Sequence, residues 1–266
     1  MTRGALVGDA SGALTTAVAL LYAAQVRRSN ASPDYRFSVA AAGHPVVGRL
    51  YASLQEGVRP GPPDEGALAK VSFAMDFPDS LGKKLLGGFR RGRTVGDAHE
   101  LDLGVLPLVR HHESGVLAPA AGGWGAAVDV GLFVLVADAS PGSAGDPGLD
   151  SGFDRLLTSF PTGVPPCVLL WVLAAPPSPD LPPASAEQAR QALGSANLVR
   201  QLPRTAARLA AAKQSPPSFY AWLEPDLSGG PTRIVRRQLL EAGGIEPKYP
   251  YEEFLALFDT LAGLAG

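Results

Sequence analysis

The chain has 266 residues, of which 46% are hydrophobic and 18% are charged, and its 23 Lys and Arg face 25 Asp and Glu for a net charge of −2. This apolar content excludes a wholly disordered chain, and the near-neutral charge argues against a nucleic-acid binder that relies on overall electrostatic attraction. The length fits one α/β domain, which we expect to span residues 1–266.

Short apolar runs alternate with helix-like segments along the chain. Strands are predicted at residues 6–8, 35–41, 70–77, 101–109, 131–137, 167–174 and 219–223. Helices are predicted at residues 13–28, 44–56, 148–160, 184–196, 199–213, 232–242 and 250–263. Continuous apolar strands separated by helices are typical of parallel sheets. We therefore expect an α/β fold with a mainly parallel central sheet flanked by helices on both faces.

The first strand leads through a glycine-containing turn into a helix, in the sequence ALVGDASGALTTAVALLY of residues 5–22. A phosphate-binding loop needs this order, because backbone N–H groups at a helix N-terminus can surround an anion. When the pattern G-x-x-x-x-G-K-[ST] is laid from Gly8, the later positions hold Ala13, Leu14 and Thr15. The segment is therefore a candidate degenerate phosphate loop, formed by Gly8, Asp9, Gly12, Ala13, Leu14 and Thr15.

This segment resembles the first strand and loop of bacterial P-loop GTPase-like proteins from multi-protein GTPase systems, which commonly read VGxxGSGKTTxLxALY. An apolar strand that ends in Asp138-Ala139-Ser140 resembles the end of a central strand in that superfamily. The strand at 167–174 lies where the strand before the guanine-reading loop is expected. The resemblance implies the sheet topology of P-loop NTPases and Ras-like GTPases.

Three motifs of that family are degraded in this chain. Leu14 replaces the lysine, and an ammonium about 4 Å from a phosphate near a protein surface is worth roughly 4 kcal/mol. The strand at 101–109 leads into Arg110-His111-His112-Glu113 without the aspartate of a D-x-x-G turn, and Asp180 has no Asn-Lys before it. The sequence therefore favours a pseudo-GTPase without catalysis or cofactor. Such a protein would be a scaffold or adaptor in a bacterial assembly, with protein partners that include an active GTPase.

Other interpretations remain open at this stage. One is an atypical GTP or NTP hydrolase that uses Thr15 for Mg²⁺ and takes its cation from elsewhere, for instance from Arg3. Another is a module that binds an acidic partner or membrane surface through a basic segment, with Lys83, Lys84, Arg90, Arg91 and Arg93 as candidate partner-binding residues. A third is an unrelated α/β fold in which Gly8 and Gly12 form an ordinary turn.

Further residues carry weaker signals. Cys167 is the single cysteine and opens an apolar run, so we expect a buried thiol without a catalytic role and a cytoplasmic protein. No apolar run reaches the ~20 residues that span a bilayer, and the apolar N-terminal stretch is interpreted as a core helix rather than a signal peptide. His111, His112 and Glu113 are adjacent, which fits a solvated loop better than a metal site.

The C-terminal segment has an apolar stripe at helical spacing, formed by Phe254, Leu257, Phe258, Leu261 and Leu264. We expect this helix to pack on the sheet of its own domain, with docking onto a partner as the alternative.

Overall fold

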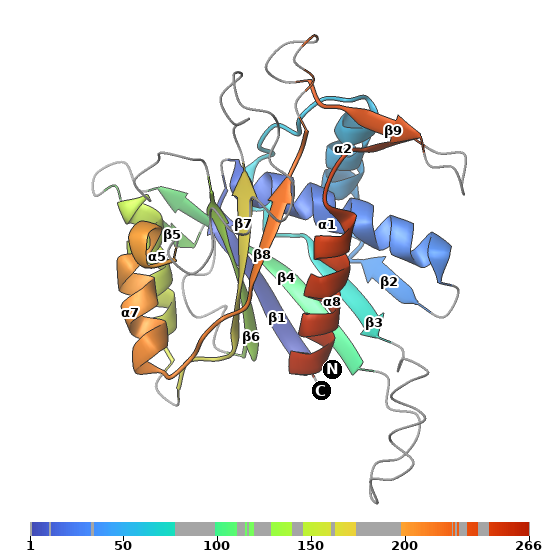
Figure 1. Cartoon of the computed structure of the whole chain (residues 1–266). Coiled ribbons are helices and arrows are strands. Elements are labelled where there is room, and N and C mark those ends of the chain that lie inside the picture. The colour runs from blue at the N-terminus through green and yellow to red at the C-terminus, as the bar shows by residue number, and fades with distance from the viewer. Residues whose placement is uncertain are drawn as a thin grey trace, which may run out of the picture.

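The computed structural model describes residues 2–10, 12–32, 35–77, 99–110, 115, 117–119, 129–139, 146–160, 163–173, 198–224, 226, 228, 233–238 and 245–265. Its strands are β1 (Thr2–Asp9), β2 (Arg36–Val39), β3 (Ser72–Phe77), β4 (His99–Arg110), β5 (Leu117–Pro119), β6 (Leu132–Asp138), β7 (Cys167–Leu173), β8 (Ser218–Trp222), β9 (Arg236–Gln238) and β10 (Ile245–Pro247). Its helices are α1 (Ala13–Ala31), α2 (His44–Gln55), α3 (Glu65–Leu68), α5 (Pro147–Thr158), α7 (Pro203–Ala211) and α8 (Tyr251–Ala265) (Figure 1).

Among the described residues, eight strands form one mixed, curled sheet in the order β2-β3-β4-β1-β6-β7-β8, with β5 beside β4 (Figure 1). β1 runs parallel to β4 and β6, and the parallel pairing continues through β7 to β8. The pairs β2–β3, β3–β4 and β4–β5 are antiparallel. The expectation of a mainly parallel central sheet flanked by helices is therefore wrong, because apolar patterning shows which residues form strands but not which way neighbouring strands run.

The central strands are buried on both faces of the sheet. Along β6, Val134 and Val136 belong to a core cluster under α1, α2 and α8, whereas Phe133 and Leu135 belong to a cluster under α5 and α7. Side chains alternate between the faces of a strand, so burial on both faces requires a continuous apolar run. This requirement explains the uninterrupted apolar sequence of β6.

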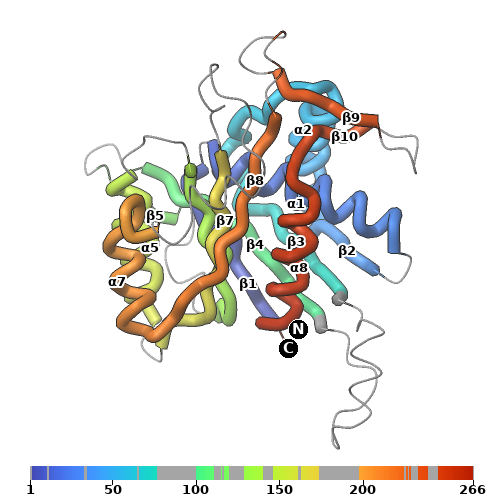
Figure 2. The backbone as a smooth tube through the Cα atoms, in the orientation of Figure 1, coloured from blue at the N-terminus to red at the C-terminus, as the bar shows by residue number. Residues whose placement is uncertain are grey.

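The C-terminal helix α8 packs on its own domain, as expected. Phe254, Leu257, Phe258 and Leu261 are all at most 1% exposed, whereas Leu264 at the end of the stripe is 40% exposed. Figure 2 shows the end of α8 beside the start of the chain, where Thr2 Oγ1 donates a hydrogen bond to the Ala265 carbonyl at 2.9 Å. Four of the five residues of the apolar stripe therefore fill this protein's core, and Leu264 remains partly exposed.

The helix predicted at 232–242 is wrong within its described part. Residues 236–238 form β9, which pairs with β10 in a separate two-stranded sheet. The Arg-Arg-Gln of β9 has ordinary helix propensity, but antiparallel pairing with Ile245–Pro247 prevails over that local preference. The helix predicted at 184–196 lies outside the described residues. Across the described ranges, no helix has both the length and the apolar character that crossing a bilayer demands.

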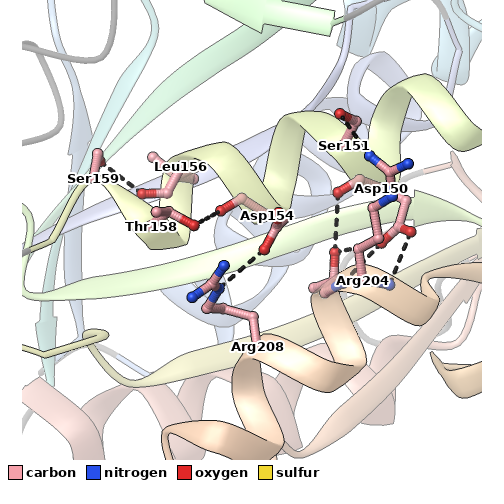
Figure 3. Close-up of polar contacts among 9 residues, drawn as sticks. Asp150, Ser151, Asp154, Leu156, Thr158, Ser159, Arg204 and Arg208 are labelled. Carbon is pink, nitrogen blue, oxygen red and sulfur yellow. Dashed lines mark hydrogen bonds and ion pairs between the residues drawn. The ribbon is translucent and has the colours of Figure 1, made fainter.

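Asp150 of α5 fixes the start of α7 (Figure 3). Its side chain is 3% exposed and accepts hydrogen bonds from Arg204 N at 3.0 Å, Thr205 N at 2.9 Å and Thr205 Oγ1 at 2.8 Å. The first N–H groups of a helix have no partner inside that helix, so a carboxylate from a neighbouring helix can cap them. Asp150 therefore joins two helices on the same face of the sheet.

Candidate functional site

The turn between β1 and α1 forms hydrogen bonds with β4 and with α1. Ala10 N donates to the Leu108 carbonyl at 3.0 Å, which continues the pairing of β1 with β4 beyond the end of β1. The Ala10 carbonyl in turn accepts from Thr15 Oγ1 at 3.3 Å. Thr15 is fully buried, and its hydroxyl is part of the hydrogen bonding of the turn. In this turn only Ser11 lies outside the described residues.

Leu14, at the position of the expected lysine, is a core residue. It is 0% exposed and belongs to the cluster that packs α1 against the sheet, and its neighbour Ala13 is 7% exposed. The side chain at position 14 therefore packs in the core. Leu14 replaces the charge of a lysine and also uses the position to fill the core.

The two glycines of the turn differ in what they do. A Cβ added to Gly8 would lie 2.8 Å from the Val136 carbonyl oxygen, which is too close for any side chain. Gly8 is therefore needed for the close approach of β1 to β6, whether or not a ligand binds. Gly12 precedes α1 with a φ of −127°, and a Cβ there would meet nothing within 4 Å. Neither glycine has the left-handed conformation that would make it indispensable in an anion-binding turn.

Charged residues gather at the carboxyl ends of β1, β4 and β6. Arg110 Nη2 lies 4.0 Å from Asp9 Oδ2, and Arg110 also forms an ion pair with Asp146. Asp146 Oδ1 accepts from Gly148 N at 2.8 Å and so caps α5. Arg110 is thus held between two carboxylates instead of being free for a phosphate. The sequence analysis overlooked Arg110, although a charged residue at the end of an apolar strand was a usable signal.

Arg59 is a second cation that the sequence analysis overlooked. Burial lowers the pKa of the Arg59 guanidinium, and the carboxylate of Asp138 opposes that change. Arg59 follows α2 in sequence, whereas Asp138 ends β6, so only the fold brings them together. Asp138, at the end of β6, therefore interacts with a cation of its own chain.

Several candidate residues from the sequence cannot be placed. The basic residues Lys83, Lys84, Arg90, Arg91 and Arg93 lie outside the described residues, as do His111, His112, Glu113 and Asp180. Within the described ranges, no three His, Cys, Asp or Glu side chains come together in a way that could hold a metal ion.

Cys167 is buried in the sheet, as the sequence analysis expected. Its thiol donates to the Pro165 carbonyl at 3.2 Å, and burial raises the pKa of the thiol to about 12. The thiolate is the reactive form, so a raised pKa makes the group inert at neutral pH.

We therefore expect a disulfide reagent such as dithionitrobenzoate to label Cys167 slowly in the folded protein at pH 8 and rapidly in guanidinium. The reaction should accelerate as the pH rises toward the raised pKa of the thiol, because more of the reactive thiolate then forms. Rapid labelling of the folded protein at pH 8 would contradict this assignment.

Comparison of the chain with protein-family models and with curated proteins found no match.

Proposed function

We propose that this chain is a non-catalytic pseudo-GTPase, acting in the cytoplasm as a scaffold or adaptor of a bacterial multi-protein assembly. The observation that carries the proposal is the β1–α1 turn, in which Leu14 is buried and the Thr15 hydroxyl binds the Ala10 carbonyl. Its partners are proteins, among them an active GTPase, and it uses no cofactor of its own. The sequence resemblance is the reason for proposing a GTPase-like protein. The β1–α1 turn is the reason for proposing that it has lost nucleotide chemistry.

Opening the turn for a triphosphate would be costly. Moving Leu14 out of the core forfeits about 1.5–3 kcal/mol of apolar burial, and each broken hydrogen bond adds roughly 1 kcal/mol. The missing ammonium removes roughly 4 kcal/mol more. Together these effects support weakening of nucleotide binding by about a thousandfold or more.

A second candidate is an atypical nucleotide binder that takes its cation from another part of the chain. The interaction of Arg59 with Asp138 favours it, because a guanidinium lies near the carboxyl end of β6. The Thr15 hydroxyl counts against it, since this group would need to leave Ala10 to reach Mg²⁺.

A titration with fluorescent GTP and ATP analogues in the presence of Mg²⁺ tests the proposal. We expect no saturable binding below millimolar nucleotide, with an intact GTPase as the positive control for the probe. Micromolar binding would overturn the proposal, and its loss in Arg59→Ala would then establish the second candidate. If Arg59→Ala still binds nucleotide at micromolar concentration, Arg59 is not the cation that the second candidate requires.

A further inference from the structure

A groove of about 670 Å³ lies outside the β1–α1 turn, between the end of α2 and the strand β9. One side is formed by Glu56 and Gly57 and the other by residues 233–238, with Ile245 of β10 also lining it. Ile245 is 51% exposed, so the groove combines an accessible apolar side chain with charged walls. This β9 groove, defined by these residues, can take several residues of an extended chain.

Two arginines of the groove are held in place by main-chain carbonyls, and no described carboxylate forms an ion pair with either of them. Arg233 Nη1 donates to the Glu56 carbonyl at 3.2 Å, and Arg236 Nη1 donates to the Gln55 carbonyl at 2.9 Å. Both acceptors are main-chain oxygens at the C-terminal end of α2. A guanidinium carries five N–H donors, so each arginine keeps donors for a ligand. The result is a pair of fixed, exposed positive charges.

A third arginine, Arg237, shares the carboxylate of Glu246 with another cation, Arg27. Arg237 Nη2 and Arg27 Nη1 lie 2.6 Å and 2.8 Å from the same oxygen of Glu246. The acids of the groove wall are Glu56 and Asp226, and Asp226 accepts from Ser228 N and Oγ at 3.0 Å and 2.6 Å. Three arginines, Arg233, Arg236 and Arg237, and two carboxylates, Glu56 and Asp226, therefore line the groove, which leaves an excess of positive charge there.

The backbone of β9 has one unpaired edge in the part of the chain that the structure describes. Val235 bonds to Glu224 and Lys248 on one side, whereas Ile234 N donates to the Gly57 carbonyl on the other. Alternate residues of a strand direct their backbone groups to opposite edges, so Arg236 and Gln238 face the same way as Ile234. Beyond Ile234 the chain that pairs with it turns away into α2, and no described residue forms a backbone hydrogen bond with Arg236 or Gln238 on this edge.

We propose that the β9 groove binds an extended acidic segment of a protein partner by strand addition to β9. The partner's main chain pairs with Arg236 and Gln238, and its carboxylates bind Arg233, Arg236 and Arg237. Main-chain pairing gives affinity in this mode, and the arginines select acidic side chains. The inference rests on the proposed scaffold role and names the chemistry of its partner. It does not depend on whether the β1–α1 turn binds nucleotide.

Fluorescence anisotropy with the intact chain tests this inference. The probe is a labelled eight-residue peptide of alternating valine and glutamate, compared with the same peptide carrying lysine in place of glutamate. We expect the glutamate peptide to bind at least about tenfold more tightly, and its affinity to fall as salt is added. Equal binding of the two peptides, or no binding of either, would overturn the proposal.

Two variants separate the contribution of charge from that of strand pairing. Arg236→Glu should weaken binding of the glutamate peptide about tenfold or more, whereas Arg49→Glu, an exposed arginine on α2, should leave it within about twofold. Gln238→Pro removes an N–H from the open edge without changing charge and should also weaken binding, unlike Gln238→Ala. Circular dichroism checks that each variant is folded. If Arg236→Glu unfolds, the comparison of the glutamate and lysine peptides on the wild-type chain still tests the proposal.

The remaining outcomes are equally informative. If polyphosphate competes with the glutamate peptide and Gln238→Pro has no effect, the groove is a general anion site and the peptide proposal is wrong. Micromolar GTP binding together with peptide binding would end the pseudo-GTPase proposal and leave this inference standing.

Discussion

Replacing Leu14 with lysine is expected to destabilise the protein strongly and to give no nucleotide binding. Restoring the sequence motif at this position puts an ammonium into a fully buried apolar site in the core under α1. Loss of a buried leucine alone costs about 2–5 kcal/mol, and burial of an unpaired charge adds to this. Urea denaturation should therefore show a fall of about 4 kcal/mol or more in the free energy of unfolding, or a chain that does not fold.

Leu14→Met is the matched control, because it keeps the apolar volume and should change the free energy of unfolding by less than about 1.5 kcal/mol. A Leu14→Lys protein with wild-type stability and micromolar GTP binding would show that position 14 reaches an open anion site. That result would remove the main support for the pseudo-GTPase proposal.

Asp150→Ala should produce the second large effect, a loss of about 3 kcal/mol or more in the free energy of unfolding. The substitution leaves two backbone N–H groups and the Thr205 hydroxyl without their carboxylate acceptor at the buried start of α7 (Figure 3). Each buried donor that loses its partner costs about 1–3 kcal/mol. Urea denaturation followed by circular dichroism measures the change.

Asp154→Asn is the control for Asp150→Ala on the same helix. Asp154 pairs with Arg208 at 3.0 Å, and both side chains are partly exposed, so the ion pair should contribute only about 0–1 kcal/mol. Equal losses in the two variants would contradict the capping role of Asp150. They would indicate that net charge on α5, rather than the buried cap, stabilises the helix pair.

Both predictions depend on side chains whose sequence context suggested other roles or none. Leu14 was identified because a lysine was expected there, and the structure shows that this position belongs to the core. Asp150 drew no attention in the sequence, since an acidic residue early in a helix is commonly an exposed partner of the helix dipole. The fold makes it a buried acceptor for a different helix, 54 and 55 residues further along the chain.

The sequence by itself determined most of the elements and the residues of the core. Continuous apolar runs predicted β6 and β7, and the apolar stripe at helical spacing predicted that α8 packs on its own domain. These features follow from local periodicity, because a side chain's face is set by its position along a strand or helix. The sequence likewise predicted the helix that follows β1 from residues that are neighbours in the chain.

Only the tertiary structure decided the direction of strand pairing and the meeting of distant charges. The antiparallel pairing of β2, β3 and β4, the hairpin of β9 and β10, and the interaction of Arg59 with Asp138 join segments that local patterns treat separately. The tertiary structure also buries Leu14 and Thr15, and the Thr15 hydroxyl donates a hydrogen bond to the Ala10 carbonyl in the turn. Such pairings depend on the free energy of the whole packed chain, and no short stretch of sequence carries that information.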